Sequence, residues 1–298
     1  MTLCNIKVEP GDAVNIVSKS QGYHYHKKDN MFSVDMFIDT INHRLKIKKY
    51  SCSNYDDFVN YVEYIADANS LSKIIMVAQE FDWEKLFVRG FVLEALHPTF
   101  FAGLPGFHIA KFMENKRRIS LQWDIEEDIV KQVRTARPNL KSLTDEYEIR
   151  SATLNDIPAL TQLFNIVFAT YPTPLNDAEY LQKLLETNSV FKLVVHHKEI
   201  VSVASIDIDY NTKSAELTDC ATLRQYEGQG LMSHLVVALE KEAKKLQLIT
   251  LYTIARAESV GINLVFARNG YNYYGRFVNN CSICGKIEDM NLWSKRVE

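Results

Sequence analysis

Two glycines in the second half of the chain occupy positions where a backbone can bind an anion. Gly228 and Gly230 lie in Gln225-Tyr226-Glu227-Gly228-Gln229-Gly230, between a β-branched segment and apolar residues at helical spacing. Because glycine has no side chain, the backbone can curl there while its N–H groups and the helix N-terminus point at one spot. This arrangement favours binding of a phosphate or pyrophosphate.

Two common phosphate loops do not fit this segment. The ATP-binding loop requires Gly-Lys-Ser/Thr after its turn, and the dinucleotide fingerprint requires Gly-x-Gly-x-x-Gly in an early parallel βαβ unit. An isolated Gly-x-Gly usually does no more than end a strand and permit a tight turn. The order of the surrounding elements favours the phosphate-binding interpretation here.

The pattern Gln225-x-x-Gly228-x-Gly230 resembles the Gln/Arg-x-x-Gly-x-Gly/Ala signature of the GNAT superfamily of N-acetyltransferases, and the element order matches from Glu146 onward. The resemblance implies acetyl-CoA as co-substrate, with its pyrophosphate on the loop amides and its pantetheine arm on the preceding strand. It also implies that strand 248–254 splays away to admit the thioester. The residues expected at the cofactor are Cys220, Ala221, Thr222, Gln225, Tyr226, Glu227, Gly228, Gln229, Gly230, Asn263 and Phe266.

Further segments resemble the β-lysine N-acetyltransferases. They are Leu217-Thr-Asp-Cys-Ala-Thr222, Tyr252-Thr-Ile-Ala-Arg-Ala257, Asn263 with Phe266-Ala267, and Asn279-Asn280 with Glu288-Asp-Met-Asn291. The resemblance covers most of the second half and, more weakly, the first. It implies acetylation of the side-chain amine of 3,6-diaminohexanoate, which gives a neutral compatible solute.

An amine attacks a thioester only when it is unprotonated, and a free side-chain ammonium has a pKa of roughly 10.4. The site therefore needs a carboxylate near the amine. Strand alternation places Asp219 with Leu217 and Ala221 on one face, and Glu216 and Thr218 on the other. We expect Asp219 to orient the ammonium or relay its proton; the alternative role is a carboxylate that accepts backbone N–H groups.

The rest of the chemistry is less constrained by the sequence. A strand N–H at Cys220 or Ala221 is expected to stabilise the oxyanion, and Cys220 is expected to pack as a buried thiol rather than act as a nucleophile. A general acid is missing from the usual place, because Phe266 stands where the superfamily often has tyrosine. The alternatives are departure of coenzyme A as the thiolate or another hydroxyl; the candidates are Tyr252, Ser259, Tyr273 and Tyr274.

An amino-acid acceptor also carries a carboxylate and a second amine. Arg256 and Asn263 offer donors to the carboxylate. Glu288, Asp289 and Asn291 offer partners to the second amine, although salt bridges within the protein are the alternative for these charges.

Hydrophobic periodicity predicts the elements that position these residues. In the first half it predicts strands over 31–38, 45–50, 73–78, 90–96 and 107–112, and helices over 54–68, 82–88 and 124–134. In the second half it predicts strands over 147–152, 190–196, 200–208, 214–223, 248–254, 271–283 and 288–293. Helices are expected over 155–168, capped by Asn155 and Asp156, over 177–187, from 231, and over 259–269, capped by Ser259 and ended by Gly270.

The expected fold is α/β (α+β): a GNAT domain over 145–298 with a mixed, mostly antiparallel central sheet flanked by helices, after a smaller α/β domain over 1–140. The segment between them, 136–145, has no period of its own. The first domain is either a partial copy of the same fold or a surface for dimerisation.

The composition limits the partners. The net charge of −3 and a pI near 6.3 give no basic excess for nucleic acid, so a small molecule is the better default. The resemblance implies a small amine and acetyl-CoA as the partners, with a homodimer possible. Five scattered cysteines, no apolar run of about 20 residues and no signal segment favour a cytoplasmic protein without a membrane segment.

Two further signals are weak. Cys281-x-x-Cys284 lacks a second pair or nearby histidines, and Tyr23-His24-Tyr25-His26 lacks an adjoining acidic residue and is interpreted as ordinary surface. No metal is therefore expected. Two alternatives to a β-lysine enzyme stay open: an acetyltransferase for another small amine, such as a polyamine or lysine, and a catalytically silent acyl-CoA-binding module.

Overall fold

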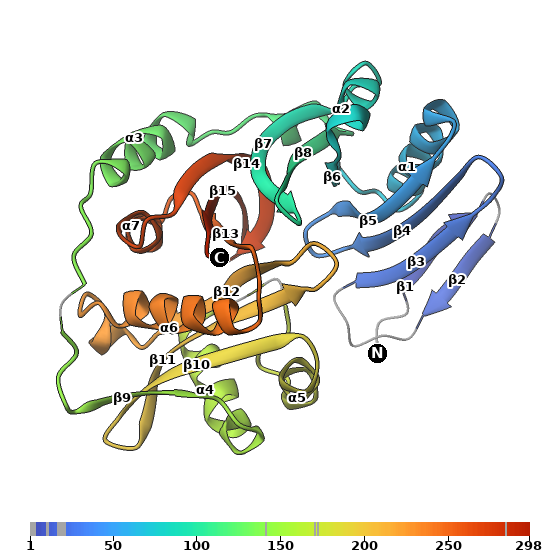
Figure 1. Cartoon of the computed structure of the whole chain (residues 1–298). Coiled ribbons are helices and arrows are strands. Elements are labelled where there is room, and N and C mark those ends of the chain that lie inside the picture. Colours follow the sequence, from blue (N-terminus) through green and yellow to red (C-terminus); the bar gives the residue numbers. More distant parts are fainter. Residues whose placement is uncertain are drawn as a thin grey trace.

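The computed structural model describes residues 4–9, 12–16, 22–140, 142–169, 171, 173–283 and 285–298. One 13-stranded sheet runs through the described chain in the order β3-β4-β5-β6-β8-β7-β14-β15-β13-β12-β11-β10-β9 (Figure 1). A separate hairpin is formed by β1 (Cys4–Glu9) and β2 (Asp12–Ile16). The large sheet is mixed and mostly antiparallel, with helices on its faces, as the expected fold class requires.

The second half of the chain contains the elements predicted for it. These are β9 (Tyr147–Ser151), α4 (Ile157–Val167), α5 (Ala178–Glu186), β10 (Ser189–His196), β11 (Glu199–Asp209), β12 (Ser214–Thr222), α6 (Leu231–Lys245), β13 (Thr250–Arg256), α7 (Val260–Arg268), β14 (Asn272–Ile283) and β15 (Lys286–Arg296). Helix α6 covers one face of β10 to β12, and α4 and α5 cover the other.

The caps of two helices differ in detail from the prediction. The first turn before α4 is held by a capping box between Thr153 and Asp156, and Asn155 is not its cap. Ser259 precedes α7 in extended backbone but makes no side-chain capping bond, whereas Gly270 ends that helix with φ 80°.

The first half is likewise α/β, and its predicted helices and strands are present. Its elements are β3 (Gly22–Lys28), β4 (Phe32–Asp39), β5 (Arg44–Cys52), α1 (Tyr55–Ala68), β6 (Lys73–Ala78), α2 (Glu80–Phe87), β7 (Val92–Phe101), β8 (Leu104–Phe112), the 3-10 turn Asn115–Arg118 and α3 (Trp123–Arg134). Residues 23–26 form part of β3 at the sheet edge, a strand that the periodicity did not predict. His24 and His26 are exposed there, as expected for ordinary surface, whereas Tyr23 is buried. An acidic partner lies on the neighbouring strand, with His26 Nδ1 2.5 Å from Asp35 Oδ1.

The two halves repeat one arrangement of strands. The order β3-β4-β5-β6-β8-β7 corresponds to β10-β11-β12-β13-β15-β14, with a helix joining the third and fourth strand of each set. In both sets those two strands pair in parallel over only three residues, 44–46 with 73–75 and 214–216 with 250–252. The turn residues His43 and Lys213, at φ 49° and 50°, also correspond. The first half therefore repeats the strand topology of the second half.

The two halves differ in the connection between their third strand and the helix that follows it. Only Ser53 and Asn54 separate β5 from α1, whereas residues 223–230 separate β12 from α6. Asn54 caps α1 by accepting the N–H groups of Asp56 and Asp57 with its side chain. A side-chain cap and two carboxylates therefore occupy the helix start that the second half leaves to a glycine turn.

The halves join edge to edge where β7 lies beside β14, and we call this junction the seam. Ala95 pairs with Gly275, and a Cβ on Gly275 would overlap the carbonyl oxygen of Glu94. The buried ammonium of Lys73 donates to Glu94 Oε1 at 2.8 Å and to the carbonyl of Val278 at 2.7 Å. Breaking this buried pair would leave a charge without a partner, so it holds the seam in one register.

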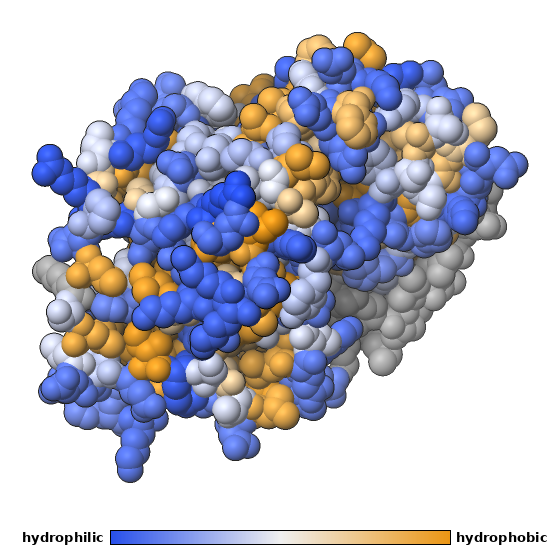
Figure 2. All heavy atoms as spheres, viewed as in Figure 1, coloured by the Kyte–Doolittle hydropathy of each residue, from blue (hydrophilic) through white to orange (hydrophobic). Residues whose placement is uncertain are grey.

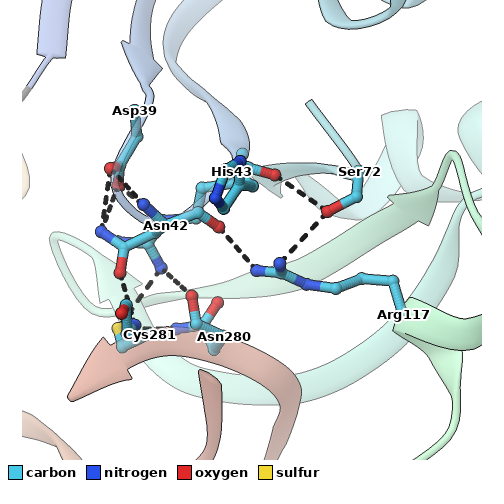
Figure 3. Close-up of polar contacts among 9 residues, drawn as sticks. Asp39, Asn42, His43, Ser72, Arg117, Asn280 and Cys281 are labelled. Carbon is cyan, nitrogen blue, oxygen red and sulfur yellow. Dashed lines mark hydrogen bonds and ion pairs between the residues drawn. The ribbon is translucent and has the colours of Figure 1, made fainter. Parts of the chain in front are cut away.

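Hydrogen bonds between loops at equivalent positions also connect the two halves. The N–H of Ala102 donates to the carbonyl of Thr212 at 2.8 Å, and the N–H of Ser282 donates to Oδ1 of Asn42 at 2.6 Å. Figure 3 shows the second turn, where Asn42 lies between Asp39 and β14, and Arg117 donates to its carbonyl at 2.7 Å. These reciprocal bonds add to the β7–β14 pairing that joins the two halves.

The surface gives no sign of a large apolar interface on the face shown in Figure 2, where apolar side chains gather in small patches among hydrophilic ones. Among the described helices, none combines the length and apolar character that crossing a bilayer requires.

Replacing Gly275 tests the seam. In Gly275→Ala the added Cβ meets the backbone of the neighbouring strand, and the residue has φ 147°, so we expect a loss of about 3 kcal/mol in the free energy of unfolding. Urea unfolding followed by circular dichroism measures it. Gly261→Ala, in α7 with open space around the new methyl group, is the control and should unfold at the wild-type midpoint or above it.

Candidate active site

The glycine turn leaves backbone N–H groups pointing outward at the start of α6. Gly228 and Gly230 have φ 74° and 83°, and Gly230 is the N-cap of the helix. A Cβ on either glycine would meet open space, so the backbone conformation, and not crowding, requires glycine. The first N–H groups of a helix have no intrahelical acceptor, and here they face an open surface suited to an anion.

A cleft of about 640 Å³ begins at this turn and passes between β12 and β13. Many of the residues expected at the cofactor or the acceptor line it. They are Asp219, Cys220, Thr222, Tyr226, Glu227, Gly228, Gly230, Arg256 and Ser259.

The cleft exists because two neighbouring strands separate. After Glu216 and Tyr252 the parallel pairing of β12 and β13 stops, although both strands continue to Thr222 and Arg256. The expected splay of strand 248–254 is therefore confirmed. Backbone groups of β12 that point into the gap have no strand partner there and are available to a ligand.

Asp219 lies at a bulge beside this gap. Its φ is 51°, and the pairing of β11 with β12 shifts between Ser205 and Val203. The bulge breaks the alternation that we expected, because Leu217 packs under α6 while Ala221 packs under α4 and is not part of the cleft lining. Asp219 nevertheless lines the cleft, owing to the bulge and not to strand alternation.

The carboxyl of Asp219 is 4% exposed and accepts a 2.7 Å hydrogen bond from Ser205 Oγ. Burial raises its pKa to about 7, the nearby Asp207 adds to the rise, and the Ser205 bond opposes it. A buried carboxyl with such a pKa can exchange a proton near neutral pH, which suits a general base.

Of the other residues proposed to take part in the reaction, some line the cleft and others do not. Burial, together with Asp219, raises the pKa of Cys220, so its thiol stays protonated. Ser259 lines the cleft. Tyr252, Tyr273 and Tyr274 do not: Tyr252 packs against His97, Tyr273 against Trp293, and Tyr274 in the cluster around Phe277.

Besides Ala221, two further residues expected at the cofactor lie in the interior instead. Phe266 is fully buried against Tyr271. Asn263 is fully buried, donates to the carbonyls of Arg256 and Ser259, and accepts from Asn291 and Trp293. Its hydrogen-bonding capacity is used within the protein, so its role here is to fix α7 against β15. Gln225 and Gln229 lie exposed in the loop, where Gln229 accepts from Tyr147.

The residues expected at the second amine are also engaged by the protein. Glu288 forms a two-point ion pair with Arg256, with both N–O distances 2.7 Å, and its side chain is 1% exposed. Asp289 is buried and accepts the N–H of Asn279, and Asn291 is bonded to Asn263 and Arg276. The guanidinium of Arg256 reaches the cleft with its charge already balanced.

Three residues that sequence reasoning missed belong to the site. Tyr171 lines the cleft beside Asp219, Ser205 positions Asp219 from β11, and Arg268 places a cation on the α7 wall. The loop containing Tyr171 was visible as a Pro-rich segment, but nothing in sequence spacing places it opposite β12.

No group of three or more His, Cys, Asp or Glu side chains suited to a metal occurs in the described part of the chain. Cys281 is buried in β14, and Cys284 lies outside the described residues.

Comparisons with known proteins agree with this geometry. Residues 157–270 match the model of the Acetyltransferase (GNAT) family. The chain is 32% identical to N-acetyltransferase YodP of Bacillus subtilis, covering 87% of this chain and 94% of that protein. It is 31% identical to a protein of Methanococcus maripaludis named beta-lysine N(6)-acetyltransferase, covering 88% and 95%.

Solved structures of other acetyltransferases match about half of this chain. The ribosomal-protein-S18-alanine N-acetyltransferase of Escherichia coli, 18% identical, covers 51% of this chain and 94% of its own, with a TM-score of 0.45. A RimL acetyltransferase in complex with coenzyme A, 21% identical, covers 52% and 97%, with the same TM-score.

Gly228→Glu tests the glycine turn. The new side chain brings a carboxylate to the place expected for a diphosphate and strains a left-handed backbone, so the KM for acetyl-CoA should rise at least tenfold. Steady-state kinetics with varied acetyl-CoA measure it. Gly103→Glu carries the same strain, at φ 98°, in the remote β7–β8 turn and should keep the wild-type KM. Equal KM values in both variants would remove the turn from cofactor binding.

Proposed function

Because the chain belongs to the GNAT family of acetyl-CoA-dependent N-acetyltransferases, we propose that its acceptor is β-lysine and that its product is N6-acetyl-β-lysine. Two relatives that match most of the chain, from Methanococcus maripaludis and Methanosarcina mazei, bear the name beta-lysine N(6)-acetyltransferase. The observation that carries the proposal is the buried carboxyl of Asp219, located in the cleft that begins at the glycine turn.

The reaction needs no covalent acyl-enzyme. The acceptor amine attacks the thioester carbon, its new N–C bond forms as the C–S bond breaks, and coenzyme A leaves as the thiolate or thiol. Asp219 takes a proton from the acceptor ammonium, either directly or through water, and so produces the neutral amine that attacks. The second N–H proton is lost as the amide forms and passes to the departing thiolate or to water. Both substrates lie in one cleft, so attack becomes effectively unimolecular.

The oxyanion requires a donor at the thioester carbonyl. The bulge at Asp219 and Cys220 interrupts the ladder with β11, and the gap next to β13 leaves that side of β12 without a partner. A backbone N–H of Cys220 can therefore point into the cleft, where a fixed donor stabilises the developing charge. The protonated thiol of Cys220 does not compete as a nucleophile.

The direct experiment measures coenzyme A release with a panel of amines. β-Lysine should give the highest kcat/KM, above α-lysine and spermidine. A higher value for spermidine would assign a polyamine acceptor. Tight acetyl-CoA binding by calorimetry with no turnover of any amine would identify a binding module and overturn the proposal.

The pH profile tests Asp219. A base must be ionised to accept a proton, and the pKa of Asp219 is about 7, so kcat/KM should rise with pH through about 7 and then level off. Asp219→Asn should abolish this rise of kcat/KM with pH and lower kcat by roughly 10²- to 10⁴-fold.

Asp177→Asn provides the matched control, because Asp177 caps α5 and asparagine is an equally good cap. It should retain both the rate and the pH profile. An Asp219→Asn enzyme with wild-type kcat would leave Asp219 only a structural role.

A further inference from the structure

Three cations of the first half lie on the sheet face opposite α1. Leu45 and Ile47 of β5 are buried in the core under α1, so the residues that alternate with them, Arg44, Lys46 and Lys48, point to the other face. Arg44 is bonded to Asp39 and to the carbonyl of Asn280. Lys46 and Lys48 are exposed.

This face continues across the seam into the second half. His97 of β7 contacts Tyr252 of β13, with ring centroids 5.1 Å apart, and His108 of β8 contacts Phe277 of β14 at 5.3 Å. Leu251, the neighbour of Tyr252, packs under α6. The sheet face opposite α1 and the face opposite α6 are therefore one surface.

The second half places carboxylates on this surface. Glu216 of β12 pairs with Tyr252 on one side and with Asp207 of β11 on the other. Thr218, two residues further along the same strand, lines the cleft next to Asp219. The acidic pair therefore lies directly beyond the acceptor end of the cleft, on the path toward the first half.

Glu216 and Lys46 occupy equivalent positions in the two halves. Each residue forms the last pair of its three-residue parallel ladder. Glu216 pairs with Tyr252, and Lys46 pairs with Ile75. The repeated fold thus places a carboxylate on one side of the seam and an ammonium on the other.

The charge of Lys46 affects the pKa of groups in both halves. Burial raises the pKa of Glu216, and the Lys46 ammonium opposes that rise. Burial also lowers the pKa of His108, and the charges of His97 and Lys46 lower it further. The Lys46 charge therefore acts on groups from both halves.

We propose that the acceptor is held between the two halves, with Glu216 and Asp207 binding the ammonium that is not acetylated and Lys46 binding the carboxylate. The inference rests on the proposed function. In β-lysine the 3-amino group and the carboxylate lie at the end remote from the reacting amine. With that amine at Asp219, the remote end extends along Thr218 and Glu216 toward Lys46.

The test compares two acceptors that differ only in the carboxylate: β-lysine and 1,4-diaminopentane. Lys46→Met removes the cation but keeps most of the unbranched side chain. The KM for β-lysine should therefore rise about tenfold or more, as expected for loss of a charge-assisted bond, while the KM for diaminopentane stays the same. Lys46→Arg should restore the KM for β-lysine. Glu216→Gln should raise the KM for both acceptors.

Two measurements separate a binding effect from a folding defect. Each variant should bind acetyl-CoA with wild-type affinity by calorimetry, because the glycine turn is untouched. Lys241→Met, on the exposed side of α6, is the matched control and should keep both KM values.

The results distinguish this inference from the proposed function. An unchanged KM for β-lysine in Lys46→Met, or an equal rise in KM for both acceptors, would overturn the proposed acceptor site between the halves. β-Lysine would remain the substrate. A wild-type enzyme that acetylates other amines but not β-lysine would overturn the proposed function, and this inference with it.

Discussion

The premature end of one parallel ladder is the constraint on which the site depends. Strands β12 and β13 pair over three residues and then separate, although both continue. A sheet that stayed paired would use its backbone groups internally and fill the gap with side chains. The separation instead exposes the backbone of β12, opens a cleft of about 640 Å³, and aligns it with the start of α6. The glycine turn and Asp219 thereby lie along one cleft.

The same three-residue ladder occurs in the first half, where it has a different outcome. There, Ser53 and Asn54 alone connect β5 to α1, and the side chain of Asn54 satisfies the first N–H groups of the helix. Without a glycine turn, that helix start presents no open nest of N–H groups to a diphosphate. The first half repeats the strand order of the second half, and in our proposal its opposite sheet face, with Lys46, completes the acceptor site.

Burial has two effects in this protein. At Asp219 it raises the pKa to about 7, because the side chains of Ser205 and Tyr171 only partly offset the cost of burying the charge. At the seam, Lys73 and Glu94 are buried as a pair, with further bonds to the backbone of β14. The first arrangement suits proton transfer, whereas the second fixes how the halves dock.

The sequence alone determined the local features of this protein. Periodicity located nearly every helix and strand, and the glycines of 225–230 located the turn that begins α6, because these signals depend on neighbouring residues. The strand β3 was missed, since a short aromatic and basic segment lacks a clear apolar alternation. Tertiary structure alone decided how charges pair: Arg256 with Glu288, Asn263 with Asn291, and the bulge that turns Asp219 into the cleft. These outcomes depend on contacts between residues far apart in the chain, so spacing along the sequence does not specify them.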